Sequence, residues 1–369
     1  MLALNDLRLS SLSGGFSLAS FMASQSAGFW YNFLRNDTMF QEDVGPTPAD
    51  EPNEVIGLAL SQRLWGGQTR TAYLAGQPEN RQNGAPVVDG TATAATYDPS
   101  TGAGTVTRVD FNNQSGVAIS GLTGARVYAI DIDAPANMNI RDGVAATGAA
   151  IAATIAGRNT YYVMIGAAAA GLTITATAAG GTQSFTLHSV RLASQVPATQ
   201  STTSFKPKRQ TTGAAFDGTD DNLLTNYTAG SGANFLIAKV VVPASLSGTQ
   251  IVAGALAATH FYLAFTAAGY ARGGAGGVTL TDTQDLRGTE VLVGFSNDGT
   301  TMRLFVGGGM VAEAPQVSGV PAAVPFRLGA LNSSGTATNF FGSSIQHVLA
   351  GREFIDLARF IQIANALGA

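Results

Sequence analysis

The chain has 369 residues, of which 45% are hydrophobic and only 12% charged, and its formal net charge is −4. This length allows two or three domains with well-buried cores. The scattered basic residues disfavour a nucleic-acid partner, which needs a basic face, and the absence of cysteine excludes disulfides and cysteine-ligated metals. The 45 glycines are typical of many short strands joined by tight turns, so a mainly β protein is predicted.

Residues 1–66 differ from the rest because apolar and aromatic side chains accompany a proline-rich acidic stretch at 45–52. Asp6 and Arg8 precede any apolar run, so no signal peptide is predicted. A segment without an obvious core of its own buries its apolar groups on a partner or on the next domain. We expect it to attach the chain to a larger particle, through Phe16, Phe21, Trp30 and Tyr31.

Residues 67–192 are predicted to form a β-sandwich of the jelly-roll type. Period-two alternation places Tyr128, Ile130 and Ile132 on one face of a strand. The uncharged stretch 159–190 also alternates and is interrupted by glycines, so no membrane insertion is expected. Strand candidates recur at sandwich spacing, at 105–111, 117–119, 126–133, 161–165, 172–177 and 184–192.

Residues 193–210 read as a linker, because Ser, Thr, Pro and charged residues occur there without periodicity. Residues 211–369 are predicted to form a second antiparallel sandwich, with 273–277 at a hairpin tip. Its last segment, 352–367, predicts an amphipathic helix packed on that sandwich or on another subunit, because apolar residues recur there at helical spacing.

The second sandwich carries a recognisable order of motifs. Phe216-Asp217-Gly218 comes first, Asn297-Asp298-Gly299 stands between two apolar strands, and Phe341-Gly342 precedes another strand. This order resembles the concanavalin A-like, laminin-G-like family. The resemblance implies a lectin-type sandwich that binds surfaces, often glycans.

A second resemblance lies in residues 28–60, which begin Gly-Phe-Trp-Tyr-Asn-Phe. The run is similar to a lead-in of tailed-phage and prophage virion proteins, written WYDP…LFQD…GTTPV…VG, although Asn32-Phe33 replace the Asp-Pro. The carbohydrate-binding-like jelly roll that often follows is matched by 124–133 and 188–192. The resemblance implies a virion surface protein of a phage or gene transfer agent, such as a head spike, a head fibre or a receptor-binding tail protein.

Residue patterns that indicate catalysis are scarce. The three histidines, at 188, 260 and 347, lie near no nucleophile elbow and share no metal-ligand spacing. Asp131 and Asp133 share a strand face, and a glycosidase needs two such carboxylates, but the Glu-x-Asp-x-x-Glu strand of lectin-like glucanases is absent. No enzyme is predicted.

Two binding sites are predicted in the second sandwich. Asp217, Asp220 and Asp221 offer oxygen ligands to a hard cation such as Ca²⁺, although such residues also form ordinary turns. Sugar sites combine an aromatic stacking surface with polar side chains. The glycan-binding candidates are Tyr262, Tyr270, Arg272 and Asn332.

These features predict a virion surface protein assembled in the bacterial cytoplasm. Its N-terminal segment would bind other virion proteins, and its two sandwiches would adhere to host capsular polysaccharide without catalysis. Several copies of a weak binding site together raise the avidity for a surface, so a homo-oligomer, either a trimer or a pentamer, is expected. A structural decoration protein without glycan binding and a polysaccharide depolymerase are the alternatives.

Overall fold

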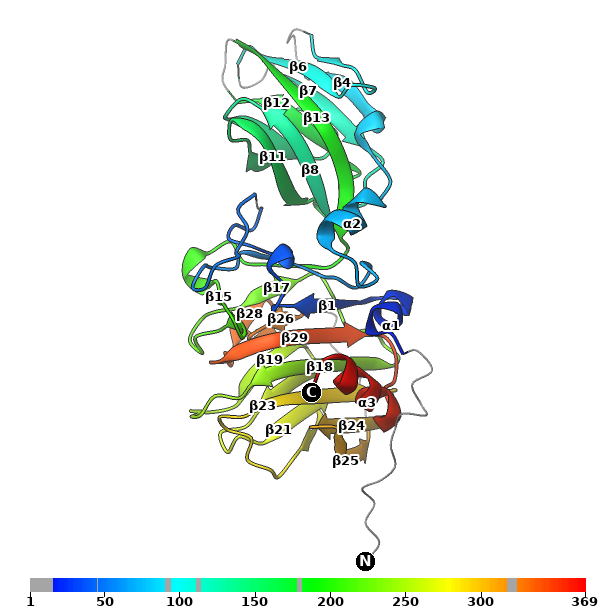
Figure 1. Cartoon of the computed structure of the whole chain (residues 1–369), viewed down its shortest axis with the longest axis vertical. Coiled ribbons are helices and arrows are strands. Elements are labelled where there is room, and N and C mark those ends of the chain that lie inside the picture. The colour runs from blue at the N-terminus through cyan, green and yellow to red at the C-terminus, as the bar shows by residue number, and fades with distance from the viewer. Residues whose placement is uncertain (1–15, 45, 90–93, 111–113, 178–180, 317–323) are drawn as a thin grey trace, which may run out of the picture.

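The computed structural model describes residues 16–44, 46–89, 94–110, 114–177, 181–316 and 324–369. Figure 1 shows the predicted jelly roll at one end of the long axis and the second sandwich at the other. The mainly β class with a short C-terminal helix is confirmed. Among the described residues, none of the helices has the length and hydropathy required to span a bilayer.

The jelly roll consists of one sheet, here called sheet C. Its strands are β4 Gly84–Asp89, β5 Thr96–Tyr97, β6 Ala103–Arg108, β7 Gln114–Ser120, β8 Val127–Ala134, β9 Met138–Asp142, β10 Ala150–Ala153, β11 Gly157–Met164, β12 Gly171–Ala176 and β13 Gly181–Ser194. The order is β10-β9-β12-β7-β6-β13-β8-β11, with β4 beside β7 and β5 beside β6. Strand β6 pairs along β13 but, within the described residues, meets β7 only at Arg108–Gln114.

The two halves of sheet C therefore fold over each other and enclose a core. Tyr128, Ile130 and Ile132 face that core, as the alternation predicts. Each predicted strand overlaps an observed one. The first, predicted over 105–111, ends at Arg108 in β6, and residue 111 lies outside the described residues. The sequence analysis missed β4, β5, β9 and β10.

The second sandwich packs sheet A against sheet B. Sheet A contains β1 Gly28–Asn32, β15 Lys208–Gln210, β16 Gly213–Ala215, β18 Asn234–Val241, β23 Glu290–Asn297, β24 Thr301–Val306, β25 Gly309–Pro315 and β29 Ser344–Gly351. Sheet B contains β2 Met39–Phe40, β3 Leu58–Leu60, β14 Pro197–Thr199, β17 Leu223–Thr225, β19 Gln250–Leu256, β20 His260–Phe265, β21 Ala271–Ala275, β22 Val278–Thr281, β26 Arg327–Leu328, β27 Leu331–Ser333 and β28 Thr336–Thr338. One apolar core lies between the two sheets.

The described part of the N-terminal segment belongs to this sandwich and is not separate from it, whereas particle attachment through residues 1–66 stays a prediction. Strand β1 pairs antiparallel with the last strand, β29, and β2 pairs with β3 in sheet B. The two strands approach so closely at Gly28 that a Cβ there would lie 2.2 Å from the Ala350 carbonyl oxygen. Phe29 and Tyr31 enter the core between the sheets, and both are buried.

The predicted linker 193–210 is not a linker in the structure, because its first two residues end β13 of the jelly roll and most of the others belong to the second sandwich. Strand β14 pairs with β3 on one side and with β17 on the other. The Lys206 ammonium of this segment donates to the Gln41 carbonyl oxygen at 2.9 Å, so this charged side chain is held by the sandwich. Because the hydrogen-bonded strands β3 and β14 flank residues 61–196, the jelly roll is an insertion into the second sandwich.

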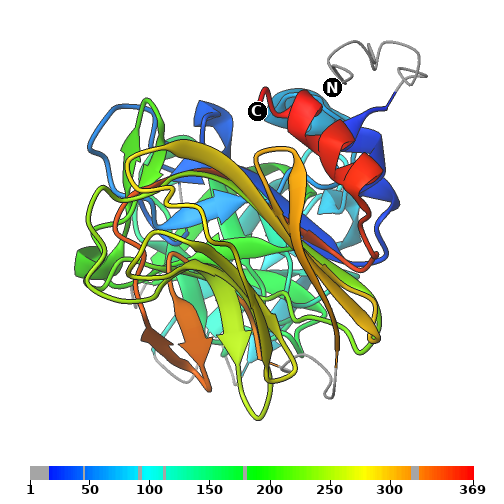
Figure 2. The same ribbon diagram turned by 90° about the horizontal axis from the view of Figure 1, so that it is seen from below.

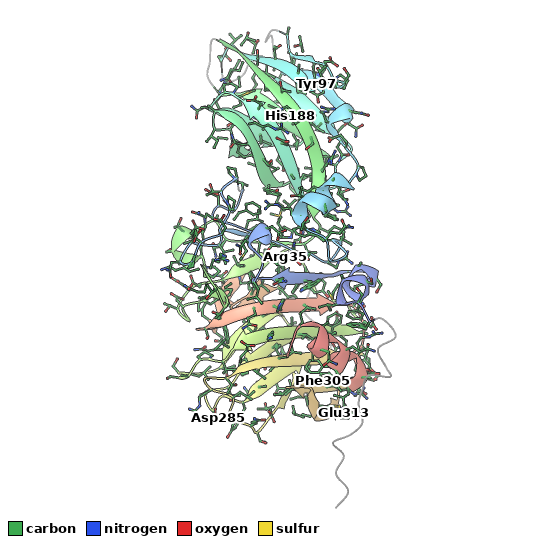
Figure 3. All side chains as sticks on the ribbon, viewed as in Figure 1. Arg35, Tyr97, His188, Asp285, Phe305 and Glu313 are labelled. Atoms are coloured by element: carbon green, nitrogen blue, oxygen red, sulfur yellow. The ribbon has the colours of Figure 1, made fainter. Side chains whose placement is uncertain are left out.

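Two helices cover the outer face of sheet A, α1 Leu18–Ser24 and α3 Leu357–Ala366, and Figure 2 shows them side by side. Helix α3 begins later than predicted because the Asp356 carboxylate caps it, accepting from the Arg359 N–H at 2.8 Å. Phe360 of α3 stacks on Phe305, labelled in Figure 3, at 4.8 Å between ring centres.

The remaining helices are short. Helix α2, Arg70–Ala75, contributes Tyr73 to an apolar cluster that joins the jelly roll to β2 and β3. The 3₁₀ turns are η2 Asn36–Thr38, η3 Arg81–Asn83 and η4 Thr203–Phe205. Helix α2 thus packs beside β2 and β3 of sheet B, whereas the small apolar cluster of Ile251, Ala264 and Leu331 on the outer face of the same sheet includes no residue of a described α-helix.

The position of Phe29 makes the N-terminal strand testable. Its ring lies 4.9 Å from Tyr31, 5.3 Å from Tyr227 and 6.2 Å from Phe326. We expect Phe29→Ala to lower the free energy of unfolding by about 3–5 kcal/mol, because it leaves a cavity in a packed core. Chemical denaturation measures the change.

The control is Leu34→Ala, because Leu34 is 43% exposed. Its effect should stay within about 0.5 kcal/mol. Equal losses in the two variants would show that β1 adds no core stability.

Candidate functional site

The outer face of sheet B carries the predicted sugar-binding strand. Side chains alternate along β20, so Phe261, Leu263 and Phe265 enter the core, whereas His260 and Tyr262 point outward and are partly buried.

Tyr262 lies between two glycines on neighbouring strands. It pairs with Gly254 of β19 and with Gly274 of β21. A Cβ at Gly274 would lie 2.7 Å from Cε1 of Tyr262 and 2.8 Å from Nε2 of His260. Both rings therefore lie across the Gly274 backbone, with ring centres 5.0 Å apart. A ring laid along a sheet can present its other face to a ligand.

Polar groups stand beside these rings. Arg272 of β21 pairs across the sheet with Thr281 of β22, and its Nε donates to Oγ1 of Thr281 at 3.1 Å. Burial raises the pKa of Tyr262, and the Arg272 charge opposes that rise. We call His260, Tyr262, Arg272 and Thr281 the Tyr262 face. It combines an aromatic surface with guanidinium and hydroxyl donors, as a sugar site requires.

The other two sugar candidates differ in position. Tyr270 immediately precedes β21, two residues from Arg272 and four from Gly274, about 13 Å from the latter along an extended strand. Asn332 is 2% exposed. Its amide donates to the Pro325 carbonyl oxygen at 2.7 Å, and its Oδ1 accepts from the Gly335 N–H at 2.9 Å. Because both ends of the amide hold the local turn, the prediction for Asn332 was wrong.

The predicted attachment side chains already have partners within the chain. Phe21, Trp30 and Tyr31 are buried. Phe16 is partly buried, with its ring 5.9 Å from that of Phe21 and 5.2 Å from the Arg359 guanidinium carbon. In this structure their apolar surface packs within the second sandwich, and their assignment to a particle contact stays a prediction.

The groups considered for catalysis are dispersed. The histidines lie on β13, β20 and β29, and Figure 3 shows His188 on the jelly roll. Burial, with the nearby Lys239 charge, lowers the pKa of His347 to about 4. In the jelly roll, the Asp131 carboxylate forms an ion pair with Arg158 at 2.6 Å.

The jelly roll contains a cleft of about 790 Å³ that the sequence analysis missed. Ser and Thr side chains of neighbouring strands line it together with small apolar residues, Phe185, Asp98 and Asp133. Tyr97, which Figure 3 labels, also lines it. The Tyr97 hydroxyl is engaged elsewhere, because it donates to the Arg81 carbonyl oxygen at 2.9 Å. The strand β5 that brings Tyr97 here has only two residues, too few for a periodic signal.

The predicted cation site lies in the loop between β16 and β17. Asp217, Asp220 and Asp221 bring carboxylate oxygens within 4.8 Å of one another. Oδ1 of Asp217 accepts from the backbone N–H groups of Thr219, Asp220 and Asp221. Turn formation therefore accounts for Asp217, and Ca²⁺ binding stays a prediction.

Asp221 has an unusual environment in this loop. Its carboxyl is 6% exposed, and Oδ2 accepts from the Asp217 N–H at 3.0 Å. Burial, followed by the negative charge of Asp217, raises the pKa of Asp221 to about 7.

Comparison with known proteins gives distant structural similarities only. No family model and no curated protein matches the chain. The CBM40 domain of Ruminococcus gnavus IT-sialidase is 21% identical, with a TM-score of 0.32 over 37% of this chain and 83% of that one. NanB sialidase from Streptococcus pneumoniae is 14% identical, with a TM-score of 0.30 over 36% of this chain and 24% of that one.

Trypanosoma rangeli sialidase is 14% identical, with a TM-score of 0.36 over 46% of this chain and 29% of that one. The chain thus matches less than a third of the length of either sialidase. At these identities the likeness concerns β-sandwich architecture alone.

The buried carboxyl predicts a pH-dependent stability. The pKa of Asp221 is about 7 in the folded chain, against roughly 3.9 when unfolded. Its protonated form therefore stabilises the fold at low pH, and this contribution is lost as pH rises from about 4 to about 7. At pH 8 we expect the free energy of unfolding of Asp221→Asn to exceed that of the wild type by an amount on the order of 2–4 kcal/mol. At pH 4 the two free energies should be nearly equal.

Denaturation across this pH range, with Asp220→Asn as the control, measures the effect. Parallel pH profiles for the wild type and Asp221→Asn would contradict the assignment. Repeating the series with Ca²⁺ tests the cation site, because a bound cation would stabilise the ionised Asp221 and remove the loss above pH 7.

Proposed function

We propose that this chain is a non-catalytic glycan-binding protein that holds a sugar on the Tyr262 face. One observation carries the proposal: the Tyr262 and His260 rings lie across a glycine on the outer face of sheet B. Sugar rings stack their C–H faces on such aromatic surfaces. The Arg272 guanidinium, already oriented by Thr281, supplies donors for sugar oxygens.

The setting proposed for this activity is the surface of a phage-like particle, where the chain would adhere to host capsular polysaccharide. This part of the proposal rests on the resemblance of residues 28–60 to a virion lead-in. Several copies in a cyclic homo-oligomer would raise the avidity of weak sites by about 10²- to 10⁴-fold. Attachment to other virion proteins would use surfaces other than the buried aromatic side chains of β1.

The Tyr262 face makes a direct prediction about binding. On an array of immobilised bacterial surface polysaccharides, we expect Tyr262→Ala to weaken binding by at least about tenfold, because it removes the stacking surface. Tyr262→Phe should retain most of the affinity, because it keeps the ring. Tyr270→Ala is the matched tyrosine comparison and should weaken binding less than Tyr262→Ala does, because Tyr270 is four residues from Gly274, on which the Tyr262 ring lies.

Each outcome separates the candidate functions. Equal loss in the Tyr262 and Tyr270 variants would move the site away from the Tyr262 face. New reducing ends in the bound polysaccharide would identify a depolymerase instead. No saturable binding to any polysaccharide would favour a structural decoration protein. Thermal melts of each variant exclude unfolding as the cause of a loss.

A further inference from the structure

A pocket of about 300 Å³ lies where the jelly roll meets the second sandwich. Three arginines, Arg63, Arg126 and Arg352, line it, and none of its lining residues is acidic. They come from three distant segments: the chain after β3, the loop before β8 and the chain after β29. In Figure 1 this junction lies between α2 and β1.

These positive charges lack carboxylate partners among the described residues. No described ion pair includes Arg63, Arg126 or Arg352. Arg63 is 7% exposed, and its guanidinium donates only to neutral oxygens, those of the Gln25 backbone and the Gln195 side chain. Burial lowers the pKa of Arg63, and the Arg126 charge adds to that effect. A buried cation without a counter-charge is costly, so an anion would be strongly favoured here.

Other buried polar atoms in the pocket also lack partners. Nε of Arg63 and Oδ1 of Asn226 are buried and make no hydrogen bond. The Tyr227 hydroxyl, on a side chain that is 4% exposed, lies within reach of the Arg352 guanidinium but without the geometry of a regular hydrogen bond. Because buried polar groups normally have hydrogen-bond partners, these atoms indicate a ligand that would supply the missing hydrogen bonds.

The backbone holds the pocket in place. Ala125, next to Arg126, has a φ of 57°, which is a strained conformation for a residue other than glycine. Its N–H donates to the Ile165 carbonyl oxygen at 3.0 Å, and its own carbonyl accepts from the Asn226 amide. The insertion and the second sandwich thus jointly fix the position at which Arg126 enters the pocket.

We propose that this junction pocket binds an oxoanion, the carboxylate or phosphate group of an acidic glycan. Arginines would hold the anion through charge-assisted hydrogen bonds, and the Tyr227 hydroxyl would donate to it. Oδ1 of Asn226 would accept from a neighbouring ligand hydroxyl. The pocket and the Tyr262 face share no residues, so either can fail without the other.

The test titrates the full chain with glucuronate, with inorganic phosphate and with glucose, using calorimetry and thermal melts. We expect glucuronate or phosphate to bind and raise Tm, and glucose to do neither. Response to glucuronate alone assigns a carboxylate, and response to phosphate alone assigns a phosphate. Arg126→Gln should raise the Kd of the anion by roughly tenfold or more, because it removes a charged donor.

Arg158→Gln is the control, because it removes the same charge from an exposed position on the jelly roll. It should leave the Kd unchanged. Arg126→Glu provides a second readout, because the new carboxylate would form ion pairs with the remaining arginines. We expect this variant to have a higher Tm without ligand and no response to anions. Absence of binding to both anions, or binding that persists in Arg126→Gln, would overturn the proposal, as would an equal response to glucose.

Discussion

The pairing of β3 with β14 is the constraint on which the rest of the structure depends. These strands lie on either side of residues 61–196, yet they are antiparallel neighbours in sheet B. The whole jelly roll therefore leaves and re-enters the second sandwich at adjacent points, which is the arrangement that domain insertion tolerates best. In sheet A, strand β1 pairs with β29 and so closes the N-terminal strand onto the last strand of the chain.

The two outer faces of the second sandwich have different roles because of this closure. Helices α1 and α3 fill the outer face of sheet A, and Trp30 of β1 lies under them. On sheet B, glycines replace the side chains that would otherwise stand on β19 and β21, and the Tyr262 ring occupies the space they leave. The covered face stabilises the fold, and the glycine-rich face offers an aromatic surface to a ligand.

Local patterns predicted the fold class and many of the strands, since alternation in residues 126–133 and 172–177 is a short-range signal. They could not predict the partner of β1, which lies more than 300 residues away in β29. The apolar run at 28–33 was therefore interpreted as a particle contact. Asn332 failed for a related reason, because its amide is consumed by a turn that sequence alone does not reveal. The junction arginines are distant in sequence and formed no motif.

The junction gives ligand binding a consequence for the whole chain. Arg63 and Arg352 belong to the second sandwich, and Arg126 belongs to the insertion, so the pocket exists only when the two are docked. Repulsion between Arg126 of the insertion and Arg63 of the second sandwich opposes docking, whereas the apolar cluster around Trp65, Tyr73 and Tyr162 favours it. An anion that binds only the docked form must stabilise that form by mass action. A site at the base of an insertion can thus couple recognition of a charged ligand to the orientation of the jelly roll.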